Sequence, residues 1–372
     1  MHMPTIFVAL FVATLPPQEA QPLESGCASI VRRWHESGEF DGVALVASKG
    51  KPVMKIAVGP ADRSWDTPLT VDACFPICSL TKQFTAVLVL DAMERGELAL
   101  DEGLGEVFQE LDGRPAASVT IRQLLLHSGG FQDPPMKHYV DPARTLKSDL
   151  EIAREYLFDQ EPGFEPGTQF RYSNADYHWL GAVLEARTKK RFSKLLEERI
   201  TAPLGMKRTG LANRAAVQAR RPRDYVRQEG VGWIHTPAYQ WSNWQAAGGL
   251  ESTVADLHRW NQALAGGELL EEKTTALMLT VPPQPGSYVA LGCWSYPRAL
   301  PGTDVTLNIA ERRGAIGGFA VLNAFDLERG DWVILLSNHA NRTLDTLSYA
   351  PCLPLDLLCA LHGGTIVGPP GR

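Results

Sequence analysis

The stretch CSLTKQFTAVLVLDAMERG, residues 78–96, places Ser79 three residues before Lys82 at the start of an apolar run that ends in glycine. Such a run is typical of a helix, on which the two side chains would lie one turn apart on the same face. A serine hydroxyl is a poor nucleophile until a neighbour takes its proton, and a lysine amine can do so when burial or nearby positive charge lowers its pKa. The stretch therefore predicts an activated serine; the alternative interpretation is a serine helix cap beside an exposed lysine.

The Ser-x-x-Lys spacing alone is a weak signal, because average composition produces about one copy by chance in a chain of this length. A second copy, Ser48 to Lys51, occurs within FDGVALVASKGKPVMKIAVG, residues 40–59. Two β-rich runs flank this copy, so the segment is predicted to be a hairpin with Ser48 and Lys51 at its turn. Solvated turn residues do not activate one another, which leaves Ser79 and Lys82 as the candidates.

Helical patterns dominate residues 74–280, in runs such as VTIRQLLLHSGG and DYHWLGAVLEARTKKRFSKLLEERI. The hairpin segment precedes this block, and the β-like runs SYVALGCWSY, VTLNIAERRG, GGFAVLNAFD and DWVILLSN follow it. A last apolar stretch, residues 343–361, is predicted to be a helix, although Pro351 and Pro354 interrupt it.

This order of elements, with strands first, helices in the middle, and strands and a helix last, predicts one α/β unit with a helical unit inserted into it. Strands from both ends of the chain would then meet in one sheet. The predicted boundaries are residues 23–72 together with 281–365 for a discontinuous α/β domain, and 73–280 for the helical domain.

The composition is that of a globular protein with a large core: 372 residues, 44% hydrophobic and 21% charged, with a formal net charge of -6. This charge argues against nucleic acid as a main partner, because no basic cluster would bind phosphates. Residues 1–22 contain an apolar run, Ile6 to Leu15, that is too short to span a membrane. We interpret residues 1–22 as a signal segment and expect export to the periplasm or the medium; the alternatives are a buried N-terminal strand and a cytoplasmic protein.

Metal and cofactor sites have no support in the sequence. The six cysteines lack Cys-x-x-Cys spacing and are expected to be small apolar core residues, with one or two disulfides if the chain is exported. There is no His-Glu-x-x-His, P-loop, Gly-x-Gly-x-x-Gly or Gly-x-Ser-x-Gly motif. The cysteines are Cys27, Cys74, Cys78, Cys293, Cys352 and Cys359.

Two further segments add to the serine and lysine. FRYSNADYHWLG, residues 170–181, holds Tyr-Ser-Asn before a helical pattern, and ERRGAIGGFAVLNAFD, residues 311–326, holds a Gly-rich strand start. With these segments the chain resembles the serine β-lactamase and penicillin-binding-protein superfamily, in its class C-like branch of β-lactamases, D-aminopeptidases, D,D-carboxypeptidases and esterases. The segments TIRQLLLHSGGF, PGTQFRYSNADYHWLG, APLGMKRTG and AAGGLESTVADLHRW also look like family segments, in family order.

The resemblance implies an α+β fold, in which an antiparallel sheet flanked by N- and C-terminal helices carries a large, mainly helical inserted domain. It also implies a role for each matching position. Ser79 would be the nucleophile, Lys82 its hydrogen-bonded partner and Tyr172 the phenolic general base or proton relay. Asn174 would donate to Lys82 or to a substrate carbonyl. The backbone N–H groups of Ser79 and Ala315 would form the oxyanion hole.

The third family motif departs from the usual pattern, because Arg312-Arg313-Gly314 stands where Lys-Thr-Gly or His-x-Gly is expected. Successive strand residues point to opposite faces, so only Arg312 shares the face of Gly314. A guanidinium cannot shuttle protons, but it can hold Lys82 and Tyr172 toward their deprotonated forms and can bind a substrate carboxylate by two hydrogen bonds.

Four other residues invite a functional reading. His127, in LLLHSGGF, is expected to be a structural loop histidine after a helix. Trp233, Trp241 and Trp244 are expected either to line an acyl-binding wall or to belong to the core.

The sequence thus predicts a serine hydrolase that acts through an acyl-enzyme on an ester, peptide or β-lactam bond. Its partner would be a small-molecule or peptide substrate. The competing hypothesis is a binding or scaffolding protein that kept the fold and lost the chemistry, which the altered third motif favours.

Overall fold

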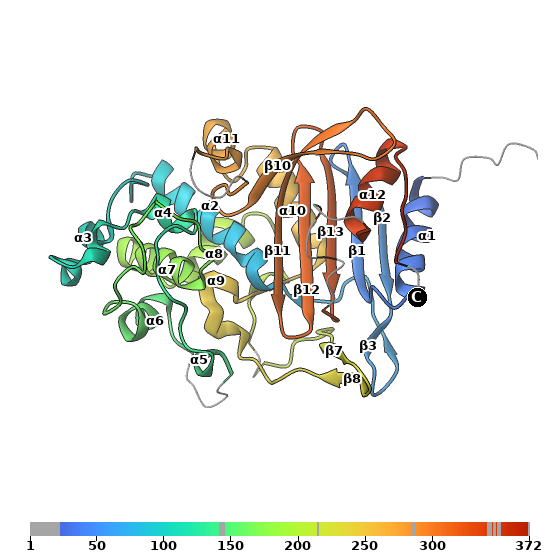
Figure 1. Cartoon of the computed structure of the whole chain (residues 1–372), viewed down its shortest axis with the longest axis horizontal. Coiled ribbons are helices and arrows are strands. Elements are labelled where there is room, and N and C mark those ends of the chain that lie inside the picture. The colour runs from blue at the N-terminus through green and yellow to red at the C-terminus, as the bar shows by residue number, and fades with distance from the viewer. Residues whose placement is uncertain are drawn as a thin grey trace, which may run out of the picture.

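The computed structural model describes residues 23–140, 146–213, 216–283, 288–340, 344, 347 and 351–370. Its centre is a six-stranded antiparallel sheet in the order β10-β11-β12-β13-β1-β2 (Figure 1). Two strands come from the N-terminal part of the chain and four from the C-terminal part, as the sequence predicted. The strands are β1 (Gly42–Ser48), β2 (Lys51–Val58), β10 (Trp294–Ala299), β11 (Thr306–Ile316), β12 (Phe319–Asp326) and β13 (Asp331–Ser337).

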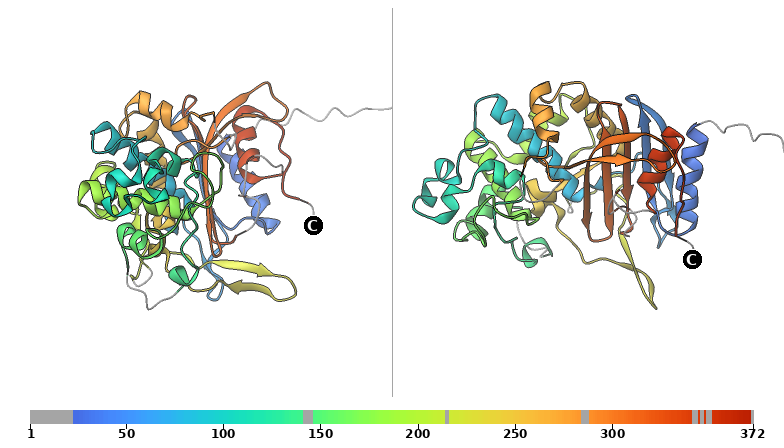
Figure 2. Two further views of the ribbon diagram at one scale, coloured as in Figure 1. Left: turned by 60° about the vertical axis from the view of Figure 1, so that its left-hand side comes forward. Right: turned by 45° about the horizontal axis from the view of Figure 1, so that its top comes forward.

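Different layers cover the two faces of this sheet. Helices α1 (Leu23–Glu36) and α12 (Leu353–His362) lie together on one face (Figures 1 and 2), where Trp34 Nε1 donates to Asp356 Oδ2 at 2.9 Å. Successive side chains of β1 are buried on alternate faces, as a pleated strand requires: Ala44 and Val46 beneath these helices, and Val43, Leu45 and Ala47 on the opposite face. The predicted α+β fold is confirmed.

The opposite face packs against a mainly helical region made by the middle of the chain (Figure 1). Helix α2 (Thr81–Glu94) and helix α7 (Asn174–Thr188) are buried along most of their length, which makes them the central helices of this region. The predicted boundaries at residues 72/73 and 280/281 stay a prediction. The other helices are α3 (Leu104–Val107), α4 (Ile121–Leu125), α5 (Lys137–Val140), α6 (Asp149–Tyr156), α8 (Phe192–Leu196), α9 (Gln245–Gly248), α10 (Val254–Ala265) and α11 (Glu272–Leu279), with short helical turns η1 (Cys78–Leu80), η2 (Gln109–Leu111), η3 (Pro115–Ser118), η4 (Glu197–Thr201) and η5 (Trp241–Trp244).

Several short strands were not predicted from the sequence. They occur where runs of two to four residues are too short for an alternating pattern to be recognised. In addition, the strand expected from residue 287 begins only at Trp294, because Gly292 takes a φ of 85° in a turn just before it. The short strands are β3 (Pro60–Asp62), β4 (Thr67–Pro68), β5 (Phe75–Pro76), β6 (Gly210–Leu211), β7 (Tyr225–Gln228), β8 (Gly232–His235) and β9 (Leu250–Ser252).

Three further expectations concern the ends of the chain and its cysteines. The expected signal segment, residues 1–22, lies outside the described residues. All six cysteines are buried and unpaired, in agreement with the interpretation as core residues. Within the described ranges, every helix is too short or too polar to cross a membrane.

Candidate active site

A tight turn aims Ser79 into a cavity at the edge of the sheet. Ser79 lies in η1, which leads directly into α2. The preceding residue, Cys78, is buried with a φ of 50°, a left-handed conformation that costs a residue with a side chain about 1–3 kcal/mol. The sequence predicted a helix start at Ser79; the structure places it one 3-10 turn before the α-helix.

Lys82 is fully buried one turn after Ser79 and donates to three acceptors. Its Nζ lies 3.3 Å from Ser79 Oγ and 2.8 Å from Asn174 Oδ1, and it also donates to the Ala247 carbonyl. Three acceptors match the three N–H bonds of an ammonium. Burial lowers the pKa of Lys82, and a phenolate at Tyr172 would raise it again.

Tyr172 completes the contact with the nucleophile. Its Oη lies 2.7 Å from Ser79 Oγ, so one proton can pass between the two oxygens. Burial of the hydroxyl raises the pKa of Tyr172, but the charges of Lys82 and Arg312 outweigh this effect and lower it to about 8. A phenol with such a pKa is partly ionised near neutral pH and can accept the serine proton.

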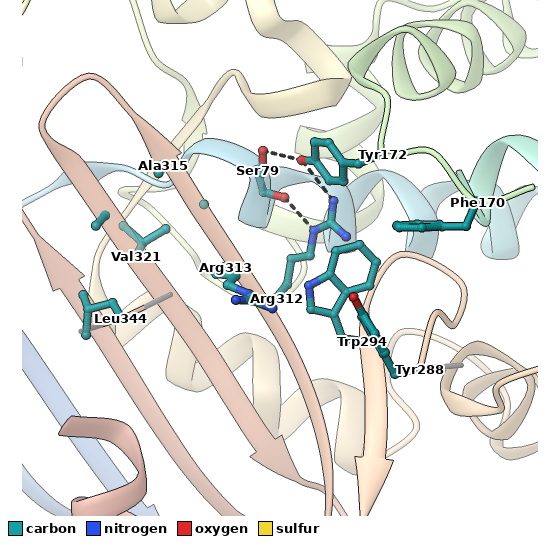
Figure 3. A pocket seen from close by; sticks show the side chains of 12 residues that line it. Ser79, Phe170, Tyr172, Tyr288, Trp294, Arg312, Arg313, Ala315, Val321 and Leu344 are labelled. Carbon is teal, nitrogen blue, oxygen red and sulfur yellow. Dashed lines mark hydrogen bonds between the residues drawn. The ribbon is translucent and has the colours of Figure 1, made fainter. Parts of the chain in front are cut away.

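Arg312 lies behind Tyr172 and faces inward. Its Nε donates to the Ser79 carbonyl at 3.2 Å and its Nη2 lies 3.4 Å from Tyr172 Oη (Figure 3). The guanidinium stacks on Trp294 at 4.4 Å from the ring centre and is only 1% exposed. Nη1 has no hydrogen-bond partner among the described residues, but it is buried like the rest of the guanidinium, so a carboxylate would have to enter the packed site to reach it. Carboxylate binding by Arg312 stays a prediction.

Arg313 takes the other face of β11. Its Nη2 lies 3.6 Å from Oε1 of the buried Glu311, two residues earlier on the same face. Its side chain is 30% exposed. The two arginines therefore diverge, as the strand register predicted.

Gly314 and Ala315 form the wall of the cavity opposite Tyr172. A Cβ at Gly314 would lie 2.6 Å from both the Ser79 nitrogen and the Ile77 carbonyl oxygen, so only glycine lets β11 approach the nucleophile this closely. The β10–β11 pairing ends at Glu311, which leaves this end of β11 with a partner on one side only. The role of the Ser79 and Ala315 N–H groups as oxyanion donors stays a prediction.

The cavity has a volume of about 380 Å³ and two unlike sides. In Figure 3, Phe170, Trp294 and Tyr288 lie on one side of Ser79, and Ala315, Val321 and Leu344 on the other. Sequence reasoning missed these three aromatic residues. They come from distant elements and share no spacing, although Phe170 stands two residues before Tyr172 in the recognised segment.

His127 packs beneath the site, where its Nε2 lies 3.4 Å from Arg312 Nη2, whereas Trp233, Trp241 and Trp244 lie elsewhere. His127 is buried 4.5 Å, ring centre to ring centre, from Tyr172, and its Nδ1 accepts the Ser173 N–H at 3.2 Å. Burial lowers its pKa well below the ordinary range, so the ring is neutral packing beneath Tyr172. None of these three tryptophans lines the cavity beside Ser79. Trp244 stacks on Tyr139, Trp241 packs on Phe319, and Trp233 lies under Arg63.

A carboxylate that the sequence did not reveal holds the start of α7. Asp133 accepts hydrogen bonds from Asn174 Nδ2 at 2.8 Å and from the backbone N–H groups of Asn174 and Ala175. Asp133 lies 41 residues before Asn174 and belongs to no spacing rule, so only the folded chain brings them together. In the part of the chain that the structure describes, no group of His, Cys, Asp or Glu side chains is arranged to hold a metal ion.

Comparisons with known proteins identify a family for the chain. The family model described as Beta-lactamase matches residues 28–349. The D-aminopeptidase of Brucella anthropi is 32% identical over 224 residues, which are 59% of this chain and 42% of that protein. A D-aminopeptidase of Cereibacter sphaeroides (strain ATCC 17029 / ATH 2.4.9) is 27% identical over 304 residues, 80% and 56% of the two chains. The chain thus spans about half the length of the curated relatives it matches.

Solved structures share the fold over nearly the whole chain. The D-amino acid amidase from Ochrobactrum anthropi SV3, complexed with D-phenylalanine, superimposes with a TM-score of 0.77 at 25% identity, covering 92% of this chain and 99% of the amidase. EstCE1, described as a hydrolase with promiscuous acyltransferase activity, gives a TM-score of 0.72 at 21% identity, with coverage of 92% and 99%. The latter identity supports a shared fold only.

Proposed function

We propose that this chain, which belongs to the beta-lactamase family, is a serine hydrolase that cleaves an ester or amide bond through an acyl-enzyme on Ser79. The contact that carries the proposal is the 2.7 Å approach of Tyr172 Oη to Ser79 Oγ, beside the buried Lys82. A solvated serine would have no such base. The relatives named D-aminopeptidase and D-amino acid amidase support an amide substrate, and EstCE1 supports the fold of an acyl-transferring hydrolase.

The mechanism follows from the protonation states that the contacts favour. Lys82 stays an ammonium, since Nζ has three acceptors, and its charge keeps part of the Tyr172 population ionised. The phenolate takes the proton of Ser79 as Oγ attacks the substrate carbonyl. The new C–O bond places a negative charge on the carbonyl oxygen, which the N–H groups of Ser79 and Ala315 would bind.

The acyl-enzyme then forms and breaks down by the same relay. Tyr172 returns its proton to the departing alcohol or amine as the scissile bond breaks, which leaves the acyl group on Ser79 Oγ. Water loses a proton to Tyr172 as it attacks the acyl carbon. When the bond between the acyl carbon and Oγ then breaks, Tyr172 returns that proton to Ser79 Oγ, and the carboxylic acid leaves. The aromatic side of the 380 Å³ cavity suits an apolar group on the acyl part of the substrate.

Covalent labelling tests this proposal directly. A fluorophosphonate probe should label the protein, and peptide mass mapping should place the label on Ser79. Ser79→Ala should abolish labelling. Ser48→Ala is the matched control, since Ser48 lies in the β1–β2 hairpin and donates to Asp331 at 2.8 Å, and it should label normally. Labelling of the Ser79→Ala protein at the wild-type rate would remove the mechanism.

The competing function is a non-catalytic binding protein with the same fold, which the arginine in the third motif favours. Measurement of substrate turnover decides between the hydrolase and the binding protein. A panel of a p-nitrophenyl ester, a D-phenylalanine anilide and a chromogenic cephalosporin would also identify the bond that is cleaved. Absence of both labelling and turnover on all three would leave the binding role.

A further inference from the structure

Asp133 contacts the amide of Asn174 on the side opposite Lys82. Its Oδ2 accepts a hydrogen bond from Asn174 Nδ2 at 2.8 Å. On the other side of the same amide, Asn174 Oδ1 accepts from Lys82 Nζ at 2.8 Å. A carboxylate, an amide and an ammonium thus form one line of hydrogen bonds, from the loop that holds Asp133 to the first turn of α2.

The chemistry of the two outer groups fixes the amide between them. A carboxylate only accepts hydrogen bonds and an ammonium only donates them. If the Asn174 amide turned over, its oxygen would face the Asp133 carboxylate and its NH₂ group would face Lys82. Both contacts would become repulsive, so one orientation is strongly favoured.

We propose that Asp133 is a positioning residue of the hydrolytic site: it fixes the Asn174 amide so that the amide oxygen holds Lys82 as an ammonium beside Ser79. The inference rests on the proposed function, in which Lys82 stays protonated while Tyr172 takes the serine proton. Asp133 does not touch the reacting atoms and acts only through Asn174.

The other charged or titratable groups around Lys82 come from several elements. The rings of Tyr172 and Tyr177 lie 5.0 and 5.3 Å from Nζ. Arg312, on β11, lowers the pKa of Lys82, whereas Asp133 raises it. His127 is neutral and packs beneath Tyr172. Among these groups Asp133 is the carboxylate, and its charge favours the ammonium.

Asp133→Asn is the sharpest test, because the new side chain is isosteric. The oxygen of the new amide still accepts hydrogen bonds from the backbone N–H groups of Asn174 and Ala175. The new NH₂ group, however, faces the NH₂ group of Asn174, so the Asn174 amide turns over and presents its NH₂ group to Lys82. We expect kcat/KM for a p-nitrophenyl ester to fall about 10- to 100-fold, the effect of one charge-assisted hydrogen bond. The alkaline limb of the pH–rate profile should move to lower pH, since Lys82 loses its proton more easily.

Two controls separate positioning from simple helix capping. Thr253→Ala removes a comparable cap from another helix, α10, where Thr253 Oγ1 accepts the Asp256 N–H at 3.2 Å, and leaves Asp133 and the Asn174 amide in place. It should lower thermal stability without moving the alkaline limb. In an Asn174→Ala background, Asp133→Asn should cost no further activity, because no amide remains to be oriented. An equal loss in both backgrounds, or an unmoved alkaline limb, overturns the proposal.

A readout that needs no turnover distinguishes this proposal from the proposed function. Ionisation of the Tyr172 phenol can be followed by ultraviolet difference absorbance against the Tyr172→Phe protein. In Asp133→Asn it should occur at higher pH, because the ammonium that stabilises the phenolate is weakened. If the wild type hydrolyses nothing yet this change appears, the positioning stands and the hydrolase fails. If the wild type is active and the phenol titration is unchanged, the positioning alone fails.

Discussion

Replacing Arg312 with Met should change the pH dependence of the enzyme more than its maximal rate. Arg312 is buried, and Met fills a similar volume, so the packing against Trp294 is largely kept. What is lost is the cation that lies 3.4 Å from Tyr172 Oη. The pKa of Tyr172, about 8 in the wild type, should therefore rise.

The size of the change follows from Coulomb's law. Over the 3.4 Å between Nη2 and Oη, opposite unit charges attract by about 1 kcal/mol at the dielectric constant of water and by about 5 kcal/mol at an effective value of about 20. Tyr172 is 40% exposed, so solvent screening favours the lower figure. At about 1.4 kcal/mol per pH unit, the pKa of Tyr172 moves from about 8 to about 9.

In the proposed mechanism the phenolate is the active form, so activity should rise as pH passes through the pKa of Tyr172. At about pH 7 the phenolate fraction falls from about one tenth to about one hundredth, and kcat/KM for a neutral ester should fall about tenfold. At about pH 10 the variant should approach the wild-type rate. Stopped-flow hydrolysis of a p-nitrophenyl ester across this range measures both limits.

Arg313→Met is the matched control: Arg313 also lines the cavity, but its guanidinium pairs with Glu311 on the other face of β11 rather than with Tyr172, so the profile should stay in place. A loss in Arg312→Met that is equal at both pH limits would refute the electrostatic reasoning. Comparing a neutral ester with a carboxylate-bearing one tests the other predicted role. An extra loss of about 10- to 150-fold in kcat/KM on the carboxylate substrate would show that Arg312 binds the carboxylate. Equal losses on the two substrates would exclude carboxylate binding by Arg312.

Two other substitutions probe the remaining parts of the site. Tyr172→Phe should fold normally and lose about 10²- to 10⁴-fold in kcat, the range for a positioned base, as steady-state kinetics and circular dichroism would show; a variant that keeps most of its rate would mean that Lys82 acts alone. Gly314→Ala should lose about 10²- to 10³-fold, since its Cβ would sit 2.6 Å from the Ser79 nitrogen and block one oxyanion donor. Gly26→Ala, where a Cβ meets nothing within 4 Å, should keep full activity; an active Gly314→Ala protein would place the oxyanion hole elsewhere.

The fold was predictable because its signals are local. Alternation in the β runs and glycine-terminated helical runs gave the order of elements, and that order admits few arrangements of an antiparallel sheet with a helical insertion. Ser79 and its three neighbours in the site were recognised in two different ways. Ser79 and Lys82 were recognised because they lie one helical turn apart, and Tyr172 and Asn174 because their segment resembles a family motif.

The rest of the site depends on contacts between distant segments. Asp133 contacts Asn174 across 41 residues of sequence, and Trp294 contacts Arg312 because β10 begins at Trp294, beside the cavity. Register alone predicted which arginine faces the site. It did not predict that Arg312 would be buried, since burial depends on the aromatic ring packed against it. The expected aromatic wall was sought in Trp233 and its neighbours because those tryptophans cluster in sequence, whereas the observed wall clusters only in space.

The arginine in the third motif is compatible with catalysis because of how charge is balanced through the reaction. Lys82 and Arg312 bring two cations close to the Tyr172 oxygen, and a phenolate there neutralises part of their charge. In the proposed mechanism Tyr172 takes the serine proton, the negative charge passes to the carbonyl oxygen of the tetrahedral intermediate, and the net charge of the site does not change. A residue that could lose its own proton would weaken this balance at high pH, but a guanidinium keeps its charge throughout. Arg312 therefore serves a site in which the anion moves from phenol to substrate while both cations remain.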